Sequence, residues 1–394
     1  MSKYADALSR LYGLVRVGEK YSLDGPRTIH RAIGSPLKAY QSILVGGTNG
    51  KGSTSNFLSC MLVAGGLKVG LFTSPHLLSF RERIRIDGEP ISERETVRLV
   101  DLVLPLVEKH GCSFFEAAWA MAALAFQQSE VDIVVWELGL GGRLDATNTC
   151  DPIGSIVTNV ALDHMAILGD TRAQIAFEKA AIFRVGRPAV TGCESSRSLL
   201  SVHTEASVEF VPMNPSLEVG LAGAHQQQNA SVAIALLEQL DLPFDRTAIT
   251  TASWTGRMER YGPLLVDAAH NPHALRCALA TAERLNRVDG RPLEIIFGVM
   301  ADKHAEALID ILLESQYPIH VVEASYPRRL DMDTLCSLLP SARVSTVGTV
   351  PSCLAQVSEN KQYLVVGSSF LAAEVIAHWR GLTYPECGIV TTAR

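Results

Sequence analysis

An alternation of short apolar runs with longer amphipathic stretches constrains the fold of this chain more than any other feature. In the first part, runs typical of strands cover residues 42–45, 69–72, 131–137, 153–158 and 188–190. In the second part, they cover 264–267, 294–298, 319–323 and 363–366. Strands that alternate with helices favour a mainly parallel sheet, so we expect an α/β fold. Because the chain has 394 residues and a domain usually takes roughly 100–200, we expect two domains.

Capping signals and the loss of periodicity divide the chain further. Ser92 and Thr171 each precede a Glu or Gln by three residues, which predicts helices to about residues 109 and 183. An alanine-rich helix is expected over 116–128, and it should be buried because 117–126 contains no polar residue. Residues 194–222 show no clear period, so we expect an irregular or β-rich segment. The domain boundary is placed between 258 and 259, which gives domains over 1–258 and 259–394.

Composition excludes several classes of protein. The formal net charge is −6, so the chain has no basic field for nucleic acid or a membrane surface. The apolar run over 117–126 is too short to span a bilayer. The eight cysteines form no Cys-x-x-Cys pair, which argues against a zinc site or a disulfide framework. No apolar stretch follows the first residues, so we expect no secretory signal and a cytoplasmic location.

A glycine-rich segment over 46–54 follows the first apolar run and precedes a helical stretch. Glycines let backbone N–H groups surround phosphate oxygens, and a helix N-terminus and Lys51 add positive charge. The strict phosphate-loop pattern requires glycine six residues before the lysine and a hydroxyl residue directly after it. Val45 and Gly52 occupy those positions and the hydroxyl comes at Ser53, so this is a displaced variant. The alternative is a strand-to-helix turn without a ligand.

Three further polar segments follow strand-like runs, over 73–76, 137–148 and 163–164. Ligands of open parallel sheets bind at the carboxyl ends of the strands, so these segments should lie beside the glycine-rich loop. Mg²⁺ prefers oxygen ligands and bridges carboxylates to phosphate oxygens. We therefore expect Glu137 and Ser74 as ligands, with His164 a less usual third. The structural alternatives are a helix cap for Glu137, a turn before proline for Ser74, and a structural histidine for His164.

Lys179 lies among apolar residues on the helix that begins after Thr171. A lysine on a helix with one exposed face is usually a solvated charge. Burial lowers the pKa of a lysine, however, and a neutral amine can react with CO₂ to give an anionic carbamate. Modification of Lys179 is a hypothesis at this point.

Together the motifs resemble the folylpolyglutamate synthase/dihydrofolate synthase family of the Mur ligase superfamily. The resemblance extends from about residue 21 to 374. It rests on eight segments in the family's order: 47–53, 73–76, 137–148, 163–164, 178–180, 225–230, 256–259 and 267–273.

The resemblance implies a Mur-ligase-like ATP-binding domain over 1–258 with a phosphate loop and a mainly parallel sheet. A smaller Rossmann-like glutamate ligase domain over 259–394 would follow, with the active site between the two. Lys51, Lys179 and His164 would be catalytic, and Lys179 would be carbamylated. Ser74, Glu137 and His164 would bind Mg²⁺. The remaining implied contacts are Gly50, Lys51, Gly52, Ser53, Asn229, Arg257 and Asp267 for ATP, and Ser113, Phe114, Phe115, Glu116, Leu144, Asp145 and Ala146 for the pterin.

The activity implied is that of an ATP-dependent ligase that adds L-glutamate to dihydropteroate, to reduced folates, or to both, through an acyl phosphate. Its cofactor would be Mg²⁺, its co-substrate ATP, and its state a monomer without nucleic-acid or membrane partners. One alternative is a Mur-ligase-type enzyme acting on another carboxylate, which is disfavoured because no separate UDP-binding domain precedes the loop. A nucleotide-binding module without activity is the other, and the presence of Lys51, Glu137 and His164 disfavours it.

Overall fold

The computed structural model describes residues 2–14, 22–301 and 305–389. The chain forms two compact units. The first unit contains Met1–Gly220, Gln226–Ala252 and Ile389–Arg394, and the second contains Leu221–His225 and Ser253–Gly388. The chain therefore passes into the second unit after Ala252, whereas the sequence motifs placed the boundary after residue 258.

The first unit is built on an eight-stranded sheet with the order β4-β3-β2-β5-β1-β6-β7-β8. All neighbouring strands from β2 to β8 are parallel, and only the β2–β3 and β3–β4 pairs are antiparallel. The predicted α/β fold with a mainly parallel sheet is confirmed for this unit. The strands are β1 (Gln41–Gly46), β2 (Val69–Phe72), β3 (Ile84–Ile86), β4 (Glu89–Pro90), β5 (Ile133–Glu137), β6 (Gly154–Val157), β7 (Ala189–Thr191) and β8 (Val208–Phe210).

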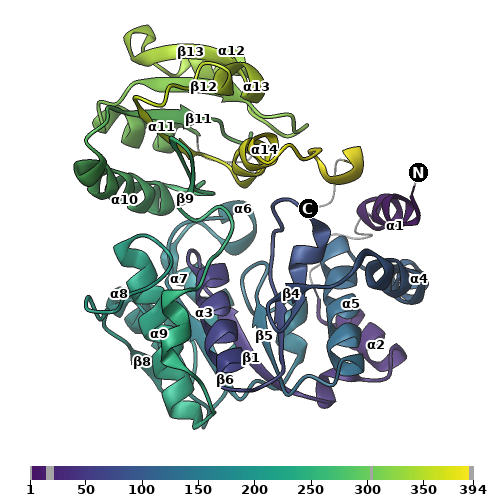
Figure 1. The fold of residues 1–394 in the computed structure, drawn as a ribbon. Coiled ribbons are helices and arrows are strands. Elements are labelled where there is room, and N and C mark those ends of the chain that lie inside the picture. Colours follow the sequence, from purple (N-terminus) through teal and green to yellow (C-terminus); the bar gives the residue numbers. More distant parts are fainter. Residues whose placement is uncertain (1, 15–21, 302–304, 390–394) are drawn as a thin grey trace. The chain divides into compact units, whose positions relative to one another are not determined.

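Helices cover this sheet, and Figure 1 shows α1, α2, α4 and α5 grouped beside one another. The alanine-rich helix α5 is buried along 117–126, as its sequence predicted, and it carries the fully buried Trp119. The helix that begins after Thr171 ends at Ala180, earlier than predicted. The helices are α1 (Lys3–Tyr12), α2 (Asp24–Ala32), α3 (Lys51–Ala64), α4 (Glu93–Lys109), α5 (Phe114–Gln128), α6 (Met165–Leu168), α7 (Arg172–Ala180), α8 (Glu194–Ser201) and α9 (Ala224–Leu240).

The expectation of an irregular or β-rich segment over 194–222 was wrong in part. The segment opens with helix α8, and only then does β8 add an edge strand to β7. Of the eight residues of α8, only Ser196 and Leu200 are buried, so the helix has little apolar periodicity to detect. Ser196 instead anchors α8 through its hydroxyl, which accepts a hydrogen bond from the Val160 N–H at 2.9 Å.

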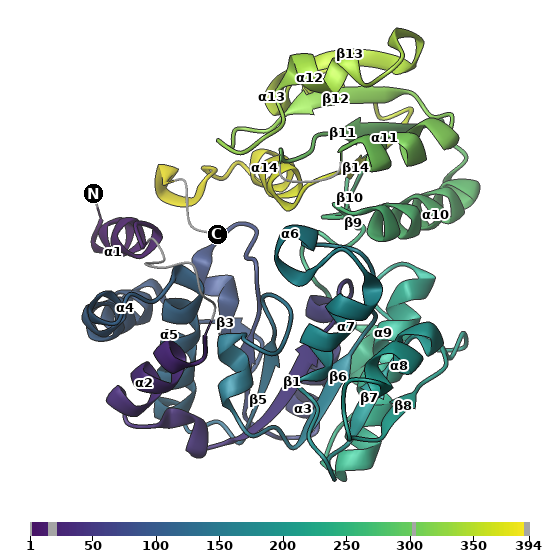
Figure 2. The same cartoon turned by 180° about the vertical axis from the view of Figure 1, so that it is seen from behind.

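The second unit has a six-stranded sheet with the order β13-β12-β11-β14-β10-β9, parallel except for the β9–β10 pair. Helices α10 and α11 lie side by side in Figure 2. The strands are β9 (Glu259–Tyr261), β10 (Leu264–Val266), β11 (Leu293–Phe297), β12 (Ile319–Glu323), β13 (Val344–Thr349) and β14 (Gln362–Val366), and the helices are α10 (Pro272–Asp289), α11 (Ala305–Glu314), α12 (Met332–Ser337), α13 (Val350–Leu354) and α14 (Ser369–Trp379).

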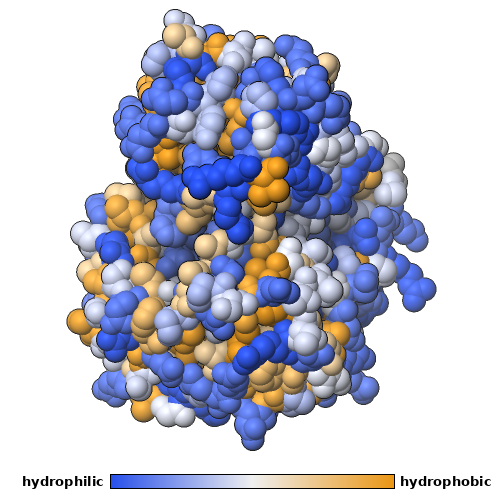
Figure 3. Space-filling view, turned by 60° about the vertical axis from the view of Figure 1, so that its left-hand side comes forward, coloured by the Kyte–Doolittle hydropathy of each residue, from blue (hydrophilic) through white to orange (hydrophobic). Residues whose placement is uncertain are grey.

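The surface drawn in Figure 3 intersperses hydrophobic residues among hydrophilic ones. Within the described ranges, none of the helices is both long enough and apolar enough to cross a bilayer.

Candidate functional site

The parallel register of the first sheet brings three of the predicted segments to one edge. Val45 of β1 pairs with Glu137 of β5, and Gly46 pairs with Val157 of β6. The glycine-rich loop therefore lies between the residues that follow β5 and those that follow β6. This is the edge at which ligands of open α/β sheets bind.

Residues after β6 hold the glycine-rich loop in place. Asn159 accepts a hydrogen bond from the Asn49 N–H at 3.1 Å and donates one to the Asn49 carbonyl at 3.0 Å. The Thr158 hydroxyl also donates to the Asn49 carbonyl, at 2.6 Å. Gly47 has a φ of +138°, and a Cβ there would lie 1.9 Å from the Thr158 hydroxyl oxygen. The loop thus requires glycine at 47 for both conformation and space.

The start of helix α3 has the properties of a phosphate cradle. A Cβ on Gly50, whose φ is +85°, would lie 2.5 Å from the Asn229 side-chain oxygen. Asn229 is itself oriented by a 2.9 Å hydrogen bond from its amide to Gln226. Ser53 lies in the first turn of α3, directly after the loop. Its hydroxyl is buried and has no hydrogen-bond partner among the described residues. A buried polar atom without a partner is costly, so a ligand oxygen or cation at this point would satisfy it.

Two lysines converge on one carbonyl oxygen of the loop. Lys51 Nζ donates to the Gly47 carbonyl at 3.2 Å, and Lys179 Nζ, from α7, donates to the same oxygen at 2.9 Å. Lys179 is only 4% exposed. Burial and the neighbouring charge of Lys51 lower the pKa of Lys179 to about 7, against the attraction of Asp163 and Asp145. The expectation that Lys179 lies among apolar residues agrees with its burial, and its catalytic role stays a prediction.

Of the three predicted metal ligands, the structure brings Ser74 and Glu137 together. The Ser74 N–H donates to Glu137 Oε2 at 3.0 Å, and Glu137 is buried at the end of β5. His164 stands on the loop after β6, with its side chain 46% exposed and its Nε2 4.0 Å from Asp163. It has a φ of +51° and precedes α6. The role of these three residues in binding Mg²⁺ stays a prediction.

The residues predicted to contact the pterin perform local structural tasks. Ser113 and Glu116 form a reciprocal cap at the start of α5, in which the Ser113 N–H donates to Glu116 Oε2 at 2.6 Å. Phe114 is buried, and Phe115 packs edge-on against Phe72 with ring centres 5.7 Å apart. The cap orders this segment, and its contact with a pterin stays a prediction.

Asp145 organises the loop that follows β5. Its carboxylate accepts hydrogen bonds from the N–H groups of Gly139, Leu140 and Thr147, and from the Thr147 hydroxyl. Burial raises the pKa of Asp145, although these four hydrogen bonds oppose the rise. The neighbouring Leu144 is half-buried and Ala146 is buried. The substrate-binding role of 144–146 is likewise untested by this geometry.

In the second unit, Asp267 follows β10 and orders its own neighbourhood. Its carboxylate accepts from the Met258 N–H at 3.0 Å and from the Ala269 N–H at 2.9 Å. The Met258 N–H belongs to the residue that follows Arg257, so this hydrogen bond joins the backbone beside Arg257 to the Asp267 carboxylate. Burial lowers the pKa of His225, and the charge of Asp267 opposes that change while that of Arg257 adds to it. The contact of Asp267 and Arg257 with ATP stays a prediction.

Sequence reasoning missed residues that support the site. Thr158 and Asn159 orient the glycine-rich loop, and Arg83 is buried beside the segment that contains Ser74. The position of Thr158 and Asn159 at the end of a predicted strand was a usable signal. No signal in the sequence pointed to the burial of Arg83, because an arginine in a run of charged residues predicts exposure.

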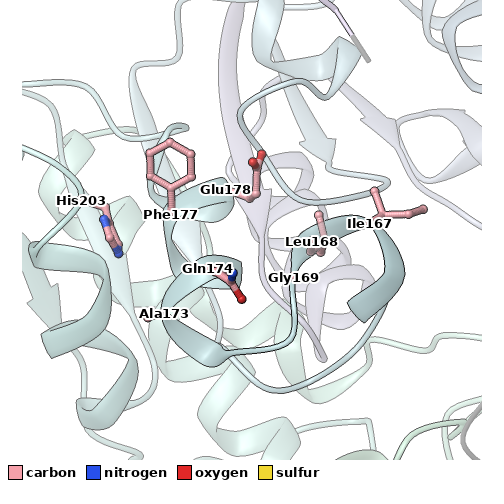
Figure 4. Close-up of a pocket in the computed structure, with 8 residues that line it drawn as sticks. All are labelled: Ile167, Leu168, Gly169, Ala173, Gln174, Phe177, Glu178 and His203. Carbon is pink, nitrogen blue, oxygen red and sulfur yellow. The ribbon is translucent and has the colours of Figure 1, made fainter. Parts of the chain in front are cut away.

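A cavity of about 470 Å³ opens beside α6 and α7 in the first unit. Figure 4 shows Phe177 and Glu178 on α7 and Leu168 on α6 around it, with His203 nearby. None of the predicted site residues lines this cavity, so the predicted nucleotide site lies elsewhere.

Comparisons with known proteins give one consistent result. Residues 256–369 match the family model described as Mur ligase, glutamate ligase domain. The chain is 32% identical to the dihydrofolate synthase/folylpolyglutamate synthase of Bacillus subtilis over 82% of this chain and 86% of that protein. A Yersinia pestis bifunctional folylpolyglutamate synthase/dihydrofolate synthase, solved with AMPPNP and a Mn ion, superposes with a TM-score of 0.86 at 28% identity. That match covers 96% of this chain and 98% of the solved one.

The chain is also similar to a longer protein. It is 34% identical, over 98% of its length, to a probable bifunctional folylpolyglutamate synthase/dihydropteroate synthase of Haloferax volcanii. It spans about half of that protein, 51% of its length.

Proposed function

We propose that this chain, which belongs to the folylpolyglutamate synthase/dihydrofolate synthase family, is an ATP-dependent ligase. It joins L-glutamate to a pterin carboxylate. The acceptor is dihydropteroate, a reduced folate, or both, and the enzyme acts as a monomer. The observation that carries the proposal is the convergence of Lys51 and Lys179 on Gly47, beside the unpartnered hydroxyl of Ser53. Such a site holds the phosphates of a nucleotide.

A divalent cation fits the residues at this edge. The buried Ser53 hydroxyl lacks a partner, and the buried Glu137 carboxylate adjoins Ser74. Ser74 and Glu137, with His164, would hold Mg²⁺, and Mg²⁺ would neutralise charge on the phosphoryl group during transfer. The Mn ion in the Yersinia pestis structure supports a divalent cation here.

The reaction requires positioning more than a side-chain nucleophile. The acceptor carboxylate attacks the γ-phosphorus of ATP, the bond to the β-phosphate oxygen breaks, and ADP leaves. The amine of glutamate then attacks the acyl phosphate, loses a proton, and displaces inorganic phosphate. Lys51 and the N–H groups at the start of α3 bind the transferring phosphoryl group, which is the main catalytic need in such transfers.

The test is release of ADP and phosphate that depends on both glutamate and a pterin acceptor, measured separately with dihydropteroate and with tetrahydrofolate. Lys51→Ala should leave the fold intact, because Lys51 is only half-buried, and should reduce turnover by about 100-fold or more. Lys109→Ala, at the end of α4, is the control and should keep normal turnover.

A second candidate, a ligase for another carboxylate, predicts a different result in the same assay. ADP would then be released with glutamate and a non-pterin acceptor only. Normal turnover in Lys51→Ala would exclude the glycine-rich loop as the ATP site in either case.

A further inference from the structure

Thr48 joins the glycine-rich loop to the segment that follows β6, through both its side chain and its backbone. Its hydroxyl donates to the Ala161 carbonyl at 3.1 Å and accepts the Ala161 N–H at 3.0 Å. Its own N–H donates to the Asn159 carbonyl at 3.0 Å. The hydroxyl thus pairs with both backbone groups of Ala161, much as a residue of a neighbouring strand would.

These contacts continue the pairing of β1 with β6 beyond the ends of the two strands. The Thr158 N–H donates to the carbonyl of Gly46, the last residue of β1, at 3.0 Å. The bonds made by Thr48 come next along both segments. Residues 46–49 and 158–161 are therefore tied together, so that a displacement of one segment displaces the other.

The segment after β6 leads directly to a predicted metal ligand. His164 lies three residues after Ala161, which is at most about 11 Å of chain. Asp163, whose side chain is 12% exposed, accepts the His164 N–H at 2.9 Å and orders the backbone there. The φ of His164 is +51°, which restricts its backbone further. The place of His164 thus depends on the place of Ala161.

The hydroxyl of Thr48 has a different task from the other polar groups of the loop. The buried Ser53 hydroxyl has no partner among the described residues, and Lys51 Nζ donates only to loop carbonyls, so both can turn to a ligand. A hydroxyl has one proton to donate, and Thr48 donates it to the Ala161 carbonyl. None is left for a phosphate oxygen, so Thr48 acts on a nucleotide indirectly.

We propose that Thr48 is a positioning residue that links the phosphate loop to His164, so that a nucleotide and a divalent cation assist each other's binding. Phosphates that order the loop would also place His164, and a cation held by His164 would order the loop. The two effects are equal in size, because coupling between two ligands is reciprocal. This assignment rests on the proposed ligase function and adds the link between its phosphate and metal sites.

Calorimetric titration with ADP, in saturating Mg²⁺ and in EDTA, tests the assignment. The quantity measured is the factor by which Mg²⁺ raises the affinity for ADP. Thr48→Val keeps the shape of the side chain and removes the hydroxyl, so it should lower this factor about 5- to 10-fold. In EDTA the variant should bind ADP as the wild type does, because Asn159 still holds Asn49. Thr48→Ser keeps the hydroxyl and should restore the wild-type factor.

His164→Ala identifies the residue through which Thr48 acts. This variant should lower the factor by itself, and adding Thr48→Val to it should lower the factor no further. Thr281→Val is the matched control, because the Thr281 hydroxyl also donates to a backbone carbonyl, that of Cys277 at 2.7 Å, within α10 of the second unit. Thr281→Val should keep the wild-type factor.

Four results would overturn the assignment. In Thr48→Val they are an ADP affinity that falls equally with and without Mg²⁺, as direct contact with phosphate predicts, and an unchanged factor, as a purely structural role predicts. The others are a wild-type factor in His164→Ala and additive losses in the double variant. Each leaves the ligase function standing, provided that the wild type binds ADP more tightly with Mg²⁺. A wild type that binds no ADP, or binds it independently of Mg²⁺, refutes the proposed ATP site and this assignment with it.

Discussion

At the scale of single residues, the two ammonium groups at Gly47 dominate the electrostatics of the site. Lys51 and Lys179 share one acceptor oxygen, so the charge of Lys51 disfavours a charge on Lys179. Because Lys179 is the more buried of the two, its pKa falls to about 7. A carbamate on Lys179 would replace this repulsion with attraction to Lys51. We propose that Lys179 carries that modification.

The first prediction at this scale is that carbamylation of Lys179 depends on pH. Only the neutral amine reacts with CO₂. Protonation therefore blocks the reaction below the folded-state pKa of about 7, and the block is lifted as pH rises through that value. At a fixed CO₂ pressure, the carbamate carbon signal from ¹³C-labelled CO₂ should grow between pH 6 and pH 8, in a range set by that pKa.

Lys179→Arg is the control for this measurement, because a guanidinium stays charged and forms no carbamate. It should lack the signal and be nearly inactive. A carbamate signal that persists in Lys179→Arg would place the modification on another residue.

At the scale of elements, the site depends on how a strand end meets a helix start. Gly47 lies between β1 and α3, in contact with the residue that follows β6. The loop conformation is thus set jointly by its own glycines and by a neighbouring strand. Helix α5 is set locally instead, by the reciprocal cap between Ser113 and Glu116.

The prediction for this loop is that Gly47→Ala destabilises the protein by about 2 kcal/mol or more. The added methyl group would lie 1.9 Å from the Thr158 hydroxyl oxygen, in a backbone conformation that alanine rarely adopts. Chemical denaturation, with and without AMPPNP, measures both the loss of stability and the loss of nucleotide binding.

Gly66→Ala is the matched control, since Gly66 follows α3 with a φ of +92° and nothing lies within 4 Å of the added Cβ. It should cost only the conformational strain, about 1 kcal/mol, and keep nucleotide binding. Equal costs in the two variants would refute the role of the Thr158 contact.

At the scale of the whole molecule, the two units have separate hydrophobic cores. One core gathers around α5 and includes Trp119 and Trp136. The other gathers around β11 and includes Phe297 and Leu364. Each sheet is therefore stabilised by its own buried residues.

It follows that a cavity in the second core should loosen the second sheet selectively. Phe297→Ala removes a fully buried ring and should cost about 3–5 kcal/mol. Amide hydrogen exchange should accelerate in β11 and β14 and stay unchanged in β1 and β5. Val288→Ala, at a position 91% exposed in the same unit, should alter neither sheet. Equal acceleration in both sheets would show that the cores unfold as one.

The sequence by itself determined the local features. The alternation of apolar runs predicted strands such as β2 and β12 at their observed bounds, because a buried parallel strand needs a continuous apolar run. Ser92 and Thr171 predicted helix starts, because capping joins residues only three positions apart. The order of the motifs indicated the family, which the comparisons confirm.

Only the tertiary structure decided how the site is held. Lys179 reaches the carbonyl of Gly47 across 132 residues, and Thr158 reaches that of Asn49 across 109. No local pattern encodes such contacts, since the order of strands in the sheet, not in the chain, brings these residues together. The burial of Arg83 has the same origin: its charge predicted exposure, and the packing of Phe114 and His76 against it decided otherwise.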